Sequence, residues 1–142
     1  MIVRPWKKGD TEQIDLQDSQ AYMGVVADLT VDMTPWSDAG LAWTGDHEGV
    51  IVGCAGLLPQ WEGRAIAWAM ISRHAGPHFP VIHKAVMRML IHAPYRRIET
   101  TVDIGFPQGV RWMKMLGFEL EGYMKAYRPD GEDMLLFARV RR

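Results

Sequence analysis

Residues 64–94, RAIAWAMISRHAGPHFPVIHKAVMRMLIHAP, join three different patterns in immediate succession. Residues 64–71 are nearly all apolar, which is typical of a central strand buried on both faces. Residues 72–80 contain a glycine and two prolines and indicate a loop. Apolar residues then recur at helical spacing over 81–93, and Pro94 ends the run. The stretch therefore predicts a buried strand, a short loop and an amphipathic helix.

Two more strands are predicted before this stretch, over residues 41–44 and 50–58. Residues 46–49 and 59–63 separate the three strands and are rich in turn-forming residues. Because both connections are short, the three strands should form an antiparallel meander.

The chain after Pro94 predicts a strand at 98–103, a helix at 107–116 and a hairpin made of 118–127 and 132–140. Gly117 supplies the left-handed residue that commonly follows a helix. A helix between the strands at 64–71 and 98–103 favours a parallel crossover between them.

The N-terminal part predicts a strand at residues 2–6 and a helix whose first turn is capped by Asp10 or Thr11. Apolar spacing over residues 14–34 indicates one or two helices, with a break at Gly24. The predicted order is β-α(α)-β-β-β-α-β-α-β-β. This order indicates an α/β fold with a mixed sheet and helices on its faces, in one domain spanning residues 1–142.

Composition narrows the classes of function. The 142 residues carry a net charge of −1, which gives no electrostatic reason to expect nucleic acid or an anionic membrane as partner. No apolar stretch approaches the length of a membrane span. Cys54 is the single cysteine and lies in an apolar run, so we expect it to be packing in a reducing, cytoplasmic protein. The five histidines show no metal-ligand spacing, so no metal site is expected.

Three short motifs resemble those of the GCN5-related N-acetyltransferase (GNAT) superfamily. They are EGVIVG at 48–53, RHAG at 73–76 and MLGFELEG at 115–122, and the predicted element order resembles the family along nearly the whole chain. The hairpin motif YRPDG at 127–131 and the altered loop also resemble small acetyltransferase-like proteins encoded by bacteriophages.

The resemblance implies that acetyl-coenzyme A is a co-substrate and that a small-molecule or protein amine is the acceptor. The pyrophosphate of coenzyme A would bind the loop at the start of the long helix, where backbone N–H groups and the positive helix end attract an anion. The pantetheine arm would pair with strand backbone. The residues implied in binding are Ile71, Arg73, His74, Ala75, Gly76 and His78. We expect Gly76 to serve close backbone approach and an unusual φ.

The chain departs from the family pattern at several positions. His78 stands where a glycine or alanine is expected, and two prolines remove N–H donors from the loop. A charged His78 would compensate at low pH. The alternative is that His74 and His78 are surface residues at the start of a helix. Phe106 replaces an asparagine, and Met113 replaces the tyrosine that protonates the leaving thiolate, although methionine donates no proton.

Candidates for proton transfer come from the C-terminal half. Asp103, at the end of its strand, is the preferred base, and capping the following turn is its alternative role. Glu99 and Glu62 are further base candidates. Tyr123 and Tyr127 are possible replacements for the missing acid, and packing is their alternative role.

The resemblance leaves a second function open: the same fold used without catalysis, as a ligand-binding, structural or interaction protein. The exposed edge of the C-terminal hairpin favours a homodimer as one possible assembly. Four tryptophans are candidates for lining an aromatic acceptor pocket or for ordinary packing: Trp36, Trp43, Trp61 and Trp68.

Overall fold

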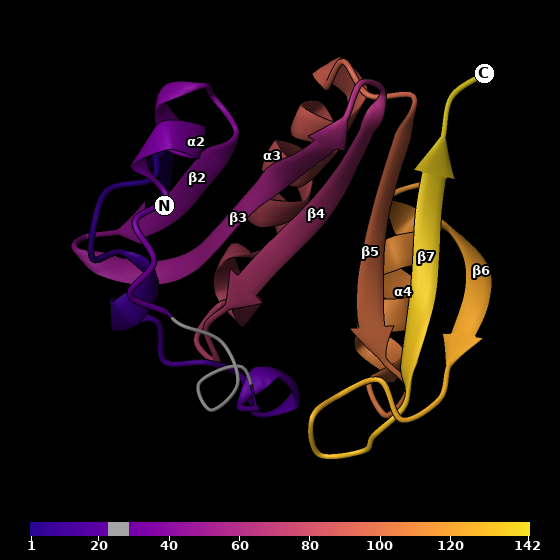
Figure 1. Cartoon of the computed structure of the whole chain (residues 1–142). Coiled ribbons are helices and arrows are strands. Elements are labelled where there is room, and N and C mark those ends of the chain that lie inside the picture. Colours follow the sequence, from indigo (N-terminus) through magenta and orange to yellow (C-terminus); the bar gives the residue numbers. More distant parts are fainter. Residues whose placement is uncertain (23–28) are drawn as a thin grey trace. The chain divides into compact units, whose positions relative to one another are not determined.

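A computed structural model describes residues 1–22 and 29–142, and within them seven strands form one mixed sheet in the order β1-β2-β3-β4-β5-β7-β6 (Figure 1). The strands span Ile2–Pro5 (β1), Ala42–His47 (β2), Val50–Trp61 (β3), Arg64–Ile71 (β4), Arg97–Asp103 (β5), Glu119–Met124 (β6) and Met134–Val140 (β7). The helices span Thr34–Asp38 (α2), Phe79–His92 (α3) and Pro107–Met115 (α4), with 3₁₀ turns at Thr11–Gln13, Asp18–Gln20 and Gly76–His78.

The predicted α/β fold and its element order from β2 onward are confirmed. β2 pairs antiparallel with β3, and β4 follows β3 in the opposite direction, so the meander is present (Figure 1). β4 pairs parallel with β5 from Arg64–Arg97 to Ile66–Glu99, as the predicted crossover requires. Gly117 has φ +85°, the left-handed conformation that was expected after α4. No helix in the described ranges is long and apolar enough to cross a membrane.

The N-terminal prediction of helices is wrong where the structure describes it. Residues 14–22 hold only a 3₁₀ turn, and Leu16 forms an isolated antiparallel bridge with Ser72. Pairing with a distant strand end thus overrides the local helical spacing. A short helix, α2, begins at Thr34. The predicted break at Gly24 lies outside the described residues.

The chain divides into two compact units. The first contains Met1–Leu58 and Trp68–Ala93, and the second contains Pro59–Ala67 and Pro94–Arg142. The prediction of a single domain stays a prediction. In the second unit, α4 lies against β5 at Gly109, where an added Cβ would lie 2.9 Å from Val102 Cγ1. The absence of a side chain at Gly109 therefore lets the helix approach the sheet.

The core of the first unit forms around β2 and β3. Its buried members are Trp6, Ile14, Ala42, Ile51 and Cys54. The Cys54 side chain is buried, and that burial raises its pKa to about 11. A thiol with this pKa stays protonated at neutral pH and is a poor nucleophile, so the structure supports the expected packing role.

The amphipathic helix α3 is covered less completely than its sequence predicts. Ile82 and Leu90 are buried, and Lys84 and Arg88 are exposed as expected. Val81, however, belongs to the predicted apolar stripe and is 43% exposed. Part of the apolar face of α3 is therefore left uncovered.

Asp10 does not cap the first 3₁₀ turn, although the sequence predicted a cap there. Its buried carboxylate accepts hydrogen bonds from both terminal nitrogens of Arg4 at 2.8 and 3.1 Å, from the Lys7 N–H at 2.7 Å and from Thr44 Oγ1 at 2.7 Å. Burial alone would raise the pKa of Asp10, but these hydrogen bonds outweigh burial and hold the pKa below its usual range. The carboxylate thus connects β1 and β2 to the segment that follows β1.

Asp10→Asn should destabilise the protein by roughly 3 kcal/mol, because it breaks the buried side of the Arg4 ion pair and leaves Asp46, at 3.3 Å from Arg4 Nε, as the remaining carboxylate. A lowered pKa means that the Asp10 contribution is present above the unfolded-state value, near about 3.9, and is lost as pH falls through the folded-state value. Urea unfolding of wild type should therefore show an acid-dependent loss that the variant lacks.

Asp38→Asn provides the matched control, since Asp38 is exposed. Parallel stability curves for wild type and Asp10→Asn between pH 6 and pH 3 would contradict this account of Asp10.

Candidate functional site

The loop between β4 and α3 uses most of its own backbone donors. The N–H groups of Arg73 and Ala75 donate to Asp15 O at 2.9 Å and to Ser72 O at 3.1 Å, and that of His74 donates to Ser72 Oγ at 3.0 Å. Among the described residues, no group accepts a hydrogen bond from the Gly76 N–H. The loop therefore retains one backbone donor for a ligand before α3 begins.

Gly76 is not required by backbone conformation. Its φ lies outside the left-handed range, so the expectation of an unusual φ is wrong. A Cβ added at this position would meet no atom within 4 Å. The small residue therefore leaves open space beside its N–H group, while the fold itself tolerates a side chain there.

The side chains of Arg73 and His74 are already engaged with the segment at 15–18. Arg73 Nε donates to Asp15 Oδ1 at 3.1 Å, its Nη2 lies 3.3 Å from Asp18 Oδ1, and His74 Nε2 lies 3.0 Å from Asp15 Oδ2. Two carboxylates therefore balance these two predicted binding residues. Arg73 and His74 must therefore leave the segment at 15–18 before they can contact an anion.

His78 packs against a second histidine. Its ring centroid lies 4.5 Å from that of His47. Burial lowers the pKa of His78, and the charges of His47 and the N-terminus lower it further. His78 is therefore neutral at pH 7 and supplies no positive charge there, so the proposed charge compensation requires acidic pH.

The free edge of β4 is covered by the chain itself. The Gln20 side-chain amide donates to Ala69 O and accepts from the Ile71 N–H, both at 2.8 Å. The Gln17 N–H donates to Ile71 O at 3.0 Å. Gln20 was not singled out from the sequence, because a glutamine 49 and 51 positions from its partners carries no local signal. One carboxamide thus replaces a neighbouring strand along this edge.

Asp103 lies at the end of β5, where it was expected. Its Oδ1 accepts from the Gly105 N–H at 2.7 Å, and its Oδ2 forms an ion pair with Arg128. The turn-capping role that the sequence left open is therefore present. Both carboxylate oxygens are engaged, so Asp103 would have to exchange Arg128 for another partner to accept a proton.

Tyr123 lies on β6 and donates from its hydroxyl to Asp133 Oδ2 at 2.6 Å. This hydrogen bond raises the pKa of Tyr123. A tyrosine held in this way releases its proton less readily.

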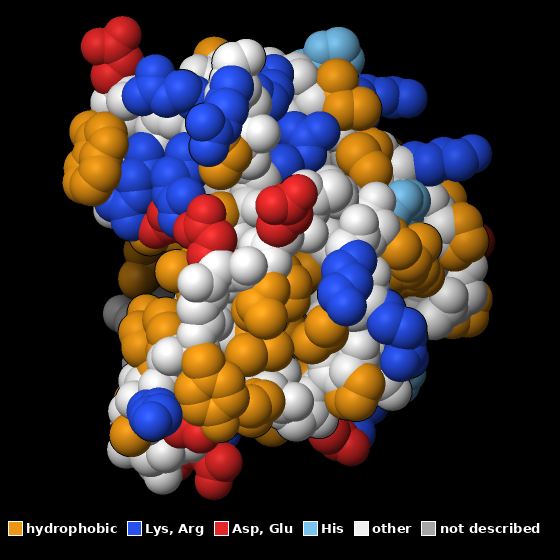
Figure 2. Space-filling view, turned by 90° about the vertical axis from the view of Figure 1, so that its right-hand side faces the viewer, with side chains coloured by type: hydrophobic (Ala, Val, Ile, Leu, Met, Phe, Trp, Pro, Cys, Tyr) orange, Lys and Arg blue, Asp and Glu red, His pale blue; other side chains and the backbone are white. Residues whose placement is uncertain are grey.

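β6 is the edge strand of the sheet. The face seen in Figure 2 carries this edge, and hydrophobic side chains gather in the middle of that face. Leu120 and Tyr123 are both more than half exposed, at 58% and 52%. The predicted homodimer through this edge stays a prediction.

Glu99 is surrounded by cations. It forms ion pairs with Arg64 and with Arg97 Nε, the latter at 2.7 Å, and Arg97 also contacts Glu121. The hydrogen bond from Arg64 is the main cause that lowers the pKa of Glu99. This electrostatic environment makes Glu99 a weak base.

Met113, which replaces the family tyrosine, is buried on α4, one turn after Gly109. The four candidate pocket tryptophans have different surroundings. Trp36 and Trp68 pack against the core of the first unit, Trp43 lines a cavity there, and Trp61 stacks on Arg64. Within the described ranges, no group of histidine, cysteine, aspartate and glutamate side chains could hold a metal ion.

Neither a protein-family model nor any curated protein matches the sequence. Solved structures do match the fold. A ribosomal-protein-alanine N-acetyltransferase from Brucella melitensis aligns with TM-score 0.75 and 16% identity over 99% of this chain and 100% of its own. A GNAT-family acetyltransferase from Streptococcus pneumoniae aligns with TM-score 0.75 and 14% identity over 99% of both chains. A putative acetyltransferase from Salmonella typhimurium, solved with its cofactor acetyl-CoA, aligns with TM-score 0.72 and 16% identity over 99% of this chain and 93% of its own. The chain therefore has the GNAT fold.

Gln20→Ala should expose the free edge of β4 by removing the partner of Ala69 O and Ile71 N. A lost hydrogen bond of this kind costs about 1 kcal/mol. Hydrogen exchange should accelerate at Ile71 by about fivefold or more, while amides within β2 and β3 stay protected. Gln13→Ala is the matched control, since the Gln13 side chain donates to Gly9 O at an exposed site. Unchanged exchange at Ile71 would mean that the side chain does not hold this edge.

Proposed function

We propose that this chain is an N-acetyltransferase that moves the acetyl group of acetyl-coenzyme A to an amine. One observation carries the proposal. The β4–loop–α3 unit, with an available N–H at Gly76, occurs in a chain whose fold matches acetyltransferases over nearly its full length. One of those proteins was solved with acetyl-CoA. The acceptor is an amine of a small molecule or a protein.

The residues around the loop fit an anion in part. The Gly76 N–H and the positive end of the 14-residue helix α3 favour a phosphate group. Arg73 adds a guanidinium only when it leaves Asp15 and Asp18. Pro77 offers no donor. We therefore expect binding to be weaker than a complete glycine-rich loop would give.

The β4 edge offers the second point of contact. Pantetheine contains amides, and the Gln20 carboxamide already pairs with Ala69 O and Ile71 N as such an amide would. We infer that Gln20 competes with the co-substrate for this edge. The Gln20→Ala variant should therefore bind acetyl-coenzyme A more tightly than wild type does.

Proton transfer in this proposal uses Asp103 as acceptor and Tyr123 as donor. Each must first exchange its present partner, Arg128 or Asp133, for the substrate. That exchange costs free energy because the groups are charged or strongly hydrogen bonded. We therefore expect the turnover of acetyl-coenzyme A to be slow.

A second function is favoured by the same contacts. The engaged Arg73, the paired Asp103 and the buried Met113 also suit a protein that binds a ligand without transferring a group. A structural or interaction role belongs to the same alternative. A cytoplasmic location and the resemblance to bacteriophage proteins stay predictions.

Gly76→Val tests the binding site. The variant should fold like wild type, because open space surrounds the position, but it should bind acetyl-coenzyme A at least about tenfold more weakly, a loss of about 1.4 kcal/mol. Titration calorimetry measures the affinity, and the melting temperature without ligand checks folding. Gly76→Ala should lie between the two proteins. No wild-type binding at millimolar acetyl-coenzyme A would overturn the proposal.

Met113→Tyr tests whether a proton donor is missing from α4. If the hydroxyl reaches the leaving thiolate, single-turnover release of coenzyme A should accelerate toward the roughly 10²- to 10⁴-fold range of general acid catalysis. Met113→Phe supplies the same ring without the hydroxyl and should not accelerate release. Equal rates for the two variants, in proteins that bind the co-substrate, would place protonation elsewhere. No turnover with any amine would favour the non-catalytic alternative.

A further inference from the structure

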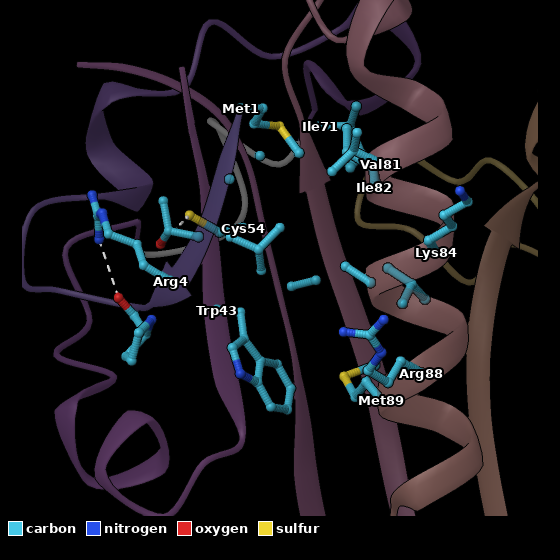
Figure 3. A pocket seen from close by; sticks show the side chains of 18 of the residues that line it. Met1, Arg4, Trp43, Cys54, Ile71, Val81, Ile82, Lys84, Arg88 and Met89 are labelled. Carbon is cyan, nitrogen blue, oxygen red and sulfur yellow. Dashed lines mark hydrogen bonds between the residues drawn. The ribbon is translucent and has the colours of Figure 1, made fainter. Parts of the chain in front are cut away.

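The first unit contains a second site with no part in the proposed transfer. A cavity of about 660 Å³ lies between α3 and the strands β1, β2 and β3 (Figure 3). We call it the sheet–helix cavity. The residues that line it are Met1, Val3, Arg4, Pro5, Trp43, Thr44, Gly45, Gly53, Cys54, Ala55, Ile71, Val81, Ile82, Lys84, Ala85, Val86, Arg88, Met89 and His92. Its volume falls within the roughly 300–1,000 Å³ typical of small-molecule sites.

The sheet side of the cavity combines small residues with two side chains that cover them. A Cβ added at Gly45 would lie 3.0 Å from Met1 Sδ, and one added at Gly53 would lie 3.3 Å from Ile71 Cδ1. Val3 pairs with Gly45, and Gly45 pairs with Gly53. Of the three residues in this cross-strand row, Val3 alone contributes a side chain to the face toward α3. The next row on the same face joins Pro5, Trp43 and Ala55. Because successive residues alternate between faces, both rows face the cavity together. The floor is therefore apolar, with the side chains of Met1 and Ile71 over the two glycines.

The apolar side of α3 forms the opposite wall. Val81, Ala85 and Met89 recur at intervals of four, which places them on one side of the helix. These are the residues that the fold leaves partly uncovered. Figure 3 shows the side chains of α3 and those of the strands on opposite sides of the cavity. A ligand that enters would bury apolar surface on both walls.

The rim is cationic. Lys84, Arg88 and His92 also recur at intervals of four along α3, and all three line the cavity and are exposed. No carboxylate in the described part of the chain pairs with Lys84 or Arg88, and none lines the cavity. This contrasts with Arg73 and Arg128, which are both paired with aspartates.

We propose that the sheet–helix cavity binds an amphiphilic carboxylate of the medium-chain fatty acid class. Its alkyl chain lies beside Met1, Ile71 and Ala55 on the sheet side, against Ala85 and Met89 of α3. Its carboxylate pairs with Lys84 and Arg88 at the rim. Apolar walls beside unpaired cations select an anion with an apolar body over a neutral or cationic one. This proposal does not rest on acetyl transfer.

The test measures decanoate binding to the full chain by titration calorimetry below the micelle concentration. One molecule should bind per chain, and affinity should rise roughly fourfold per methylene from hexanoate to decanoate. Decan-1-ol and decyltrimethylammonium have the same chain without the anion and should bind at least about tenfold more weakly.

Two variants separate the head and tail contacts. The double variant Lys84→Glu with Arg88→Glu should weaken decanoate binding about tenfold or more, since two attractive contacts become repulsive. Arg111→Glu with Lys114→Glu makes the same charge change on exposed residues of α4 and should leave affinity unchanged. Ala85→Phe fills the cavity and should abolish binding, and Ala85→Leu repeats this test if the larger residue unfolds the protein.

Gly76→Val keeps this result distinct from the proposed function, because it should retain decanoate binding whatever it does to acetyl-coenzyme A. Equal affinity for decanoate and decan-1-ol would contradict the proposal that the cavity recognises an anion. Unchanged affinity in both cavity variants would overturn the site. A dimer that the Lys84 and Arg88 substitutions dissociate would assign the cavity to a second copy of the chain instead.

Discussion

The backbone of β4 must satisfy its hydrogen bonds after its ladder with β5 ends at Ile66, and much of the candidate site follows from that need. Buried N–H and C=O groups without partners are costly. The Thr100 hydroxyl donates to Ala67 O, and Gln20 serves Ala69 O and Ile71 N. The segment that carries Gln20 is thereby held beside the β4–α3 loop. Asp15 and Asp18 of this segment then pair with Arg73 and His74. The hydrogen bonding of the β4 backbone therefore also places carboxylates beside the basic side chains of the loop.

The charged groups near the candidate chemistry are consistently paired. Asp103 contacts Arg128, Tyr123 contacts Asp133, and Arg73 contacts Asp15. Each pairing stabilises the charged or hydrogen-bonded form that is present and opposes the change of partner that catalysis needs. The same contacts are compatible with slow transfer and with binding alone. Fold similarity does not choose between these functions, because one fold supports many sites.

Helix α3 contributes to both sites that we propose. Its first turn follows the β4–α3 loop, where the Gly76 N–H and the helix dipole favour an anion. Its side, three turns long, forms one wall of the sheet–helix cavity, with Lys84 and Arg88 at the rim. The two sites use different physics. The first relies on backbone groups that the chain partly occupies, and the second relies on apolar surface that the chain leaves open.

The sequence by itself determined the strands, the helices and their order from β2 onward. Its signals there are local: period two or a continuous apolar run for strands, period 3.6 for α3, and a glycine for the left-handed residue after α4. They also located the β4–α3 loop and the position of Asp103. Residues 14–22 were misassigned because helical spacing there reflects contacts with other segments rather than a helix.

The tertiary structure alone decided the partners of these residues. The Asp10 carboxylate meets Thr44 across 34 positions, Gln20 meets β4 across 49, and Asp103 meets Arg128 across 25. Gly45 and Gly53 share a face only because two strands pair in one particular register. A register shifted by one residue would turn the same glycines to the other face. Such contacts depend on how distant segments pack, and no local pattern in the chain encodes them.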